Sequence, residues 1–147
     1  MNKITFPHMG DYYIPINYLL ENITKSIVII PPPITKKTIE LGSKYSPDYV
    51  CMPFKYNLGN FIEALENGAN VILQAGGGCR YGYYAELQEQ ILKDLGYKFE
   101  FVNFIENNHV SIFNIYNYAK SLNKKLNIIS FSYYVLNTAI MIIIMDK

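Results

Sequence analysis

Charged residues are scarce in this sequence: they make up 17% of its 147 residues, and the formal net charge is +1. A domain that binds nucleic acid usually carries a basic patch or stripe. Here the lysines and the acidic residues are dispersed, so the sequence has no basic stripe, charged tail or polybasic anchor. This composition argues against a nucleic-acid partner. The first seven residues also lack the apolar run of a signal peptide, and we therefore expect a cytoplasmic protein.

Cysteine is scarce as well: the two present, Cys51 and Cys79, do not form a Cys-x-x-Cys pair of the thioredoxin type. In a reducing compartment, paired cysteines more often serve metal binding or redox chemistry than a structural disulfide. Residues 76–78 are three glycines whose backbone N–H groups could cradle an anion. They match neither the G-x-G-x-x-G fingerprint nor the P-loop, so a nucleotide site is only weakly indicated.

Half of the residues are apolar, which is enough for one domain with a hydrophobic core. Short apolar runs alternate with amphipathic stretches, and this alternation predicts a parallel sheet with helices on both faces. We therefore expect an α/β fold: a three-layer, doubly wound parallel sheet of flavodoxin or Rossmann type, with about five strands. The strands are expected at residues 4–6, 27–30, 49–52, 71–73 and 98–104, and helices at 12–23, 35–41, 111–122 and just before Gly68 and Gly96.

Right-handed crossovers place every strand-to-helix loop at one edge of a parallel sheet, where ligands bind in open α/β folds. Cys51 and Cys79 are expected to end two successive strands there, and neighbouring strands lie only about 5 Å apart. Lys55 and Arg80 follow the two cysteines in sequence, and nearby cations favour the thiolate form. His8 is expected at the same edge, suited to proton transfer, a ligand contact or a hydrogen bond that orders its loop.

The two cysteines also have simpler explanations. Free cysteine is among the most buried residue types, so both could be small core residues. Zinc is another alternative, because two cysteines and His8 with one open position would equal a catalytic zinc site in ligand number. The residues by themselves leave these alternatives open.

Several stretches match a known family: FPHMG at 6–10, TIELG at 38–42, SPDYVCMPFK at 46–55, LGNFIE at 58–63, ENGAN at 66–70 and CRYGYY at 79–84. Through them the chain resembles the 2-hydroxyacyl-CoA dehydratase component D family, which also includes benzoyl-CoA reductase subunits. Within that family it looks closest to the branch labelled CoA-enzyme-activase-related. The likeness runs in order over roughly residues 4–104 and fades past Asn107.

The resemblance implies an iron–sulfur protein of an anaerobic bacterium, with a dehydratase (lyase) as its catalytic relative. Relatives use a [4Fe–4S] cluster, held by cysteine thiolates, to deliver one electron to a CoA thioester, and an ATP-hydrolysing activator protein supplies that electron. Cys51 and Cys79 match the family positions of the cluster ligands. Around the cluster or a CoA-linked ligand we expect His8 as a catalytic group and Lys55, Gly77, Gly78 and Arg80 as binding groups.

Relatives contain two such domains, with another cluster cysteine in the second. We therefore expect residues 1–125 to form the α/β domain, and residues 126–147 to be an apolar helical segment that would lead to a missing second domain. Because two thiolates alone hold a [4Fe–4S] cluster poorly, a partner subunit or a homodimer is expected to complete the site. Independent catalysis by this chain is not expected.

Residues 128–145 contain no charged side chain and just reach the length of a membrane span. Ser130, Ser132, Asn137 and Thr138 argue against that interpretation, and no basic cluster flanks the segment. The alternatives are a buried helix, or a short helix followed by a buried strand at 139–144. The family likeness favours a helix, and without its packing partner such an apolar helix should promote dimerisation or aggregation.

Overall fold

The computed structural model describes residues 2–74, 84–106 and 109–146 of the chain. Four short strands, β1 (Lys3–Thr5), β2 (Ile27–Val28), β3 (Val71–Gln74) and β4 (Glu100–Asn103), form one parallel sheet in the order β2-β1-β3-β4. β1 pairs with β2 through Lys3 and Ile27, and with β3 through Ile4 and Val71. The chain therefore has the predicted α/β fold with a Rossmann-like layout, but this sheet has four strands and not five.

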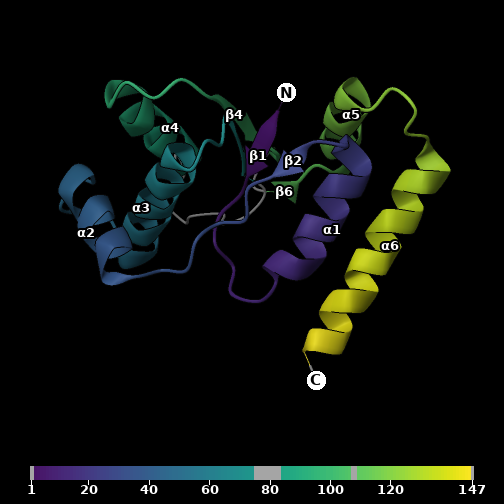
Figure 1. The fold of residues 1–147 in the computed structure, drawn as a ribbon, viewed down its shortest axis with the longest axis horizontal. Helices are drawn as coiled ribbons and strands as arrows, with labels where there is room; N and C mark the ends of the chain where they lie inside the picture. Colours follow the sequence, from purple (N-terminus) through teal and green to yellow (C-terminus); the bar gives the residue numbers. More distant parts are fainter. Residues whose placement is uncertain (1, 75–83, 107–108, 147) are drawn as a thin grey trace.

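Helices cover both faces of the sheet (Figure 1). On one face lie α1 (Tyr13–Thr24), α5 (Ile112–Leu122) and α6 (Ile128–Met145); on the other lie α2 (Lys36–Tyr45), α3 (Met52–Glu66) and α4 (Tyr84–Asp94). A two-stranded antiparallel sheet, β5 (Ile105–Glu106) with β6 (His109–Val110), precedes α5. Successive side chains of β3 alternate between the two faces, as strand geometry requires. Val71 and Leu73 join one hydrophobic core and Ile72 joins the other.

The predicted strand at residues 49–52 is wrong. Residues 46–51 form a loop with an 84% exposed Tyr49, and α3 begins at Met52, directly after Cys51. The physical reason is the direct packing of α2 on α3, which leaves no room for a strand of the sheet between them. Cys51 is consequently the residue before a helix, and it does not end a parallel strand.

Two glycines bring α2 and α3 together. A Cβ atom at Gly42 would overlap the carbonyl of Lys55, and a Cβ atom at Gly59 would overlap the carbonyl of Thr38. The sequence context of Gly42 suggests the end of a helix. In the structure Gly42 lies inside α2, at the point where α2 and α3 are closest. The start of that helix is as predicted: the Thr35 side chain accepts a hydrogen bond from the backbone N–H of Thr38 and caps α2.

The C-terminal segment is one continuous helix, α6, so the alternative with a strand at 139–144 is wrong. Phe131 packs edge-on against the ring of Tyr116 with 5.2 Å between centroids, and Asn137 donates to the hydroxyl of Tyr18 on α1. Most of α6 is exposed, so the predicted alternative of a buried helix holds only for the side that faces the domain. By length and composition, α6 could also cross a membrane.

Candidate functional site

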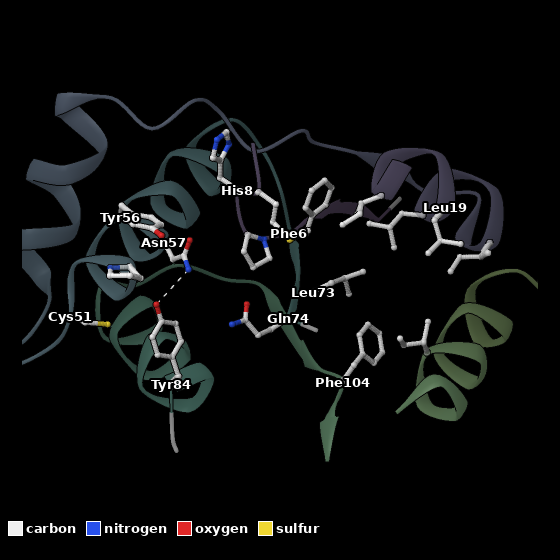
Figure 2. Close-up of a pocket in the computed structure, with 17 residues that line it drawn as sticks. Phe6, His8, Leu19, Cys51, Tyr56, Asn57, Leu73, Gln74, Tyr84 and Phe104 are labelled. Carbon is white, nitrogen blue, oxygen red and sulfur yellow. Dashed lines mark hydrogen bonds between the residues drawn. The ribbon is translucent and has the colours of Figure 1, made fainter. Parts of the chain in front are cut away.

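A pocket of about 650 Å³ lies at the carboxyl edge of the sheet, where β1 and β3 end (Figure 2). From β1 the chain crosses to β2 on one side, whereas β3 lies on the other side, so the strand order reverses between β1 and β3. Open α/β sheets bind their ligands at such a switch point, because the two loops diverge there and leave a crevice. Phe6, Pro7 and His8 follow β1 and line the pocket, as do Leu73 and Gln74 of β3.

The inner walls of the pocket are apolar. Four residues of α1 line it, and they are the apolar face that the helical periodicity predicts: Ile16, Leu19, Leu20 and Ile23. Phe104 and Ile115 close the same end of the pocket, and Figure 2 shows Leu19 and Phe104 well away from Cys51. These walls suit the hydrocarbon part of a ligand, since apolar lining with a few placed polar groups is typical of small-molecule sites.

Polar groups gather at the other end of the pocket, near the start of α3. Cys51, Tyr56 and Asn57 come from this helix and its N-terminal boundary, and Tyr84 comes from the first residue of α4. The Asn57 side-chain amide donates to the Tyr84 hydroxyl across 3.5 Å. Two buried polar atoms of the pocket, Oδ1 of Asn57 and Nδ1 of His8, have no hydrogen-bond partner among the described residues. Both can therefore bind a polar group of a ligand.

Cys51 is exposed and occupies the N-cap position of α3, with an extended backbone and a proline in the first turn. Cys51 is therefore not a small buried core residue. Its side chain makes no capping hydrogen bond, and the positive end of the α3 dipole favours an anion at this position. Cys51 is thus placed to present its sulfur to a ligand at the pocket mouth.

Of the other predicted site residues, some line the pocket and some do not. His8 lines the pocket, as the sequence predicts, whereas Lys55 does not; Lys55 turns its carbonyl toward Gly42. Gly77, Gly78, Cys79 and Arg80 lie outside the described residues. The residues on either side of that segment, Gln74 and Tyr84, both line the pocket. In the part of the chain that the structure describes, no three His, Cys, Asp or Glu side chains come together as a metal site.

Sequence reasoning missed Tyr56, Asn57 and Phe104. Tyr56 and Asn57 lie in the second turn of α3, on the same face as Pro53, so placing the helix start at Met52 would have brought them to the pocket. Phe104 comes directly after β4 and reaches the pocket from the far side of β3. Its aromatic character predicts a core residue equally well, and no sequence signal separates the two roles.

Comparison with family models, with curated proteins and with solved structures found no match to this chain. The resemblance to the dehydratase family therefore stays a prediction from the sequence. What the structure supplies independently is the fold, the switch-point pocket and the position of Cys51 at its mouth.

Tyr118 on α5 gives the structure a pH dependence that can be measured. Burial, and next the charge of Glu100, raise the pKa of Tyr118 to about 12, and its ring packs on Phe104 with 5.8 Å between centroids. An unfolded tyrosine ionises near pH 10, so the folded state alone keeps this proton between about pH 10 and 12. The contribution to stability is complete below pH 10, and we expect it to be lost as the pH rises through 12.

The measurement compares wild type with Tyr118→Phe in denaturant unfolding at several pH values. The hydroxyl of Tyr118 has no hydrogen-bond partner among the described residues, so the variant should keep wild-type stability at neutral pH. Above pH 10 it should become the more stable protein of the two. A difference that does not change with pH would show that Tyr118 titrates like an exposed tyrosine.

Proposed function

We propose that this chain is one domain of an iron–sulfur protein related to the 2-hydroxyacyl-CoA dehydratases. In this proposal the switch-point pocket receives the acyl part of a CoA thioester, and Cys51 and Cys79 are two ligands of a [4Fe–4S] cluster at the pocket mouth. The observation that carries it is the pocket itself, with apolar walls at one end and Cys51 at the other. A thiolate and an acyl site at one sheet edge are what electron delivery to a thioester needs.

The segment that contains Cys79 supports the same proposal through its two ends. Gln74 precedes it and Tyr84 follows it, and both side chains line the pocket that Cys51 also lines. His8, with its enclosed Nδ1, is the described group best placed to hold or move a proton on a bound ligand.

The donor set of this chain does not complete a [4Fe–4S] cluster. Such clusters are held by four cysteine thiolates, and the sequence has only Cys51 and Cys79. The other ligands have to come from outside these 147 residues, and the proposal assigns them to a partner subunit or to a second copy of the chain. We derive no reaction step through the cluster, and we do not expect the isolated chain to catalyse dehydration.

A non-catalytic binding or assembly domain is the second candidate. It is favoured by the apolar walls of the pocket, which suit a small apolar ligand whether or not a metal is bound nearby. In this candidate the pocket binds a small apolar ligand without redox chemistry, and the cysteines are free or bind zinc.

Anaerobic reconstitution with iron and sulfide tests the first candidate against the second. Wild type should develop the broad visible absorbance of thiolate-to-iron charge transfer, and Cys51→Ala or Cys79→Ala should each lose most of it. Met52→Ala, a substitution of the exposed neighbour of Cys51, is the matched control and should keep the band. The cluster proposal fails if no band forms, or if both cysteine variants keep it. Metal analysis of the same samples identifies zinc in place of iron.

A further inference from the structure

The outer side of α6 carries a regular apolar stripe. Five large side chains follow one another at spacings of four, three, four and three residues, and they are 45–78% exposed: Ile129, Tyr133, Leu136, Ile140 and Ile143. This is the a/d spacing of a heptad repeat, in which every side chain lies on one seam of the helix. We call these five residues the α6 seam.

The seam lies opposite the side of α6 that the domain already covers. Phe131 and Thr138, seven residues apart, are the buried residues of this helix, and both occupy positions opposite the a/d seam in the heptad. Tyr18 of α1 packs edge-on against Tyr134, and the Tyr12 hydroxyl donates to the Asp146 carboxylate at the end of α6. These contacts hold α6 along α1, as Figure 1 shows, and they leave the seam uncovered.

The same contacts argue against a membrane as the occupant. A membrane-spanning helix is surrounded by lipid or by other apolar helices, whereas α6 lies along α1, which presents the charged side chain of Glu21 to its surroundings. A helix that lies on a membrane surface typically has lysines and arginines on its polar face. Residues 128–145 contain none.

A second copy of the chain fits the seam in both area and charge. With the neighbouring Ile144, which is 65% exposed, the seam offers about 600 Å² of apolar surface, the lower end of the share that each partner contributes to a stable interface. Because no charged side chain lies on α6, two copies can approach without like-charge repulsion. The helix is already ordered by α1, so association need not fold it.

We propose that this protein forms a two-fold symmetric dimer in which the α6 seams of two copies pack against each other. The interface is isologous, with the same side chains contributed by both copies. Leu136 lies at the middle of the helix, so it approaches its own copy near the two-fold axis whether the two helices run parallel or antiparallel.

Sedimentation equilibrium of the full chain without detergent tests the proposal. Wild type should have twice the chain mass of 17.0 kDa. The double variant Leu136→Glu/Ile140→Glu should have a dissociation constant at least about 100-fold higher, because each copy would bring two unpaired carboxylates into an apolar interface. Tyr49→Glu changes an even more exposed side chain in the loop between α2 and α3, two helices that lie on the other face of the sheet from α6 (Figure 1), and should stay dimeric. Circular dichroism should show all three proteins folded, since none of these side chains is buried.

Disulfide trapping gives a second, independent readout. In a Cys51→Ser/Cys79→Ser background, Leu136→Cys should oxidise to a covalent dimer, whereas Tyr49→Cys should not. A monomeric wild type at 100 µM, a dimer that Leu136→Glu/Ile140→Glu does not weaken, or a monomer that sediments with phosphatidylglycerol vesicles would each overturn the proposal.

Discussion

Replacing Gly59 by alanine is expected to lower the free energy of unfolding by about 2 kcal/mol, although alanine is the better helix former. The new methyl group would overlap the carbonyl of Thr38, and the backbone N–H of Gly42 lies 3.0 Å from the same point. Because both neighbours are backbone atoms inside α2, no side chain can rotate away, and the two helices have to separate. Overpacking of this kind lowers the free energy of unfolding by about 3 kcal/mol, and the higher helix propensity of alanine offsets about 1 kcal/mol of that loss.

Urea unfolding measures this loss. Gly42→Ala should destabilise the protein by a similar amount, because its methyl group would overlap the carbonyl of Lys55 on the other side of the same contact. The double variant should lose less free energy of unfolding than the two single variants together, because the helices have to separate only once. Ser43→Ala, at an exposed neighbouring position of α2, is the control and should change stability by less than about 0.5 kcal/mol. Single variants as stable as this control would show that α2 and α3 are farther apart.

The α2–α3 contact also decides where the site residues lie. Cys51, Tyr56 and Asn57 all belong to α3 or its boundary, so the position of α3 against the sheet places the polar end of the pocket. The sequence predicts α3 itself from the spacing of Leu58, Phe61, Ile62 and Leu65. It does not predict that Gly42 is a packing position inside α2, because a glycine after an apolar stretch equally indicates a helix end.

The wrong strand at residues 49–52 has a related cause. A run of four apolar residues fits a buried strand, a helix start or a loop equally well, and periodicity does not separate them over so short a length. Burial decides in the folded protein: Tyr49 and Met52 are exposed, whereas the true strand β3 is buried at every residue. The strands that were predicted correctly, at β1, β2, β3 and β4, all have a helix packed on at least one side.

The pocket shows the same division between local and distant information. The apolar face of α1 and the position of His8 after β1 follow from the sequence alone, because helical spacing and strand ends are local patterns. The combination of α1, α3 and the end of β4 around one cavity depends on the strand order, which no local pattern specifies. Only the order β2-β1-β3-β4 identifies the crevice between β1 and β3 as the site.

Filling this crevice is expected to abolish the preference for long acyl chains that the proposed function assigns to it. In Leu19→Trp an indole ring would occupy the apolar end of the pocket, between α1 and Phe104, and displace the hydrocarbon part of a ligand. Loss of about four buried methylene groups, at about 0.8 kcal/mol each, corresponds to roughly 200-fold weaker binding. Calorimetric titration of the full chain with hexanoyl-CoA measures this change.

Two comparisons make the titration specific for the pocket. Ile14→Trp introduces the same indole on the same helix, at an exposed position that does not line the cavity, and should bind hexanoyl-CoA like wild type. In wild type, acetyl-CoA should bind more weakly than hexanoyl-CoA, whereas Leu19→Trp should bind both equally, because only the longer chain reaches the apolar walls. Equal affinity of wild type for hexanoyl-CoA and free CoA would exclude the pocket as an acyl site, and it would do so whether or not Cys51 binds iron.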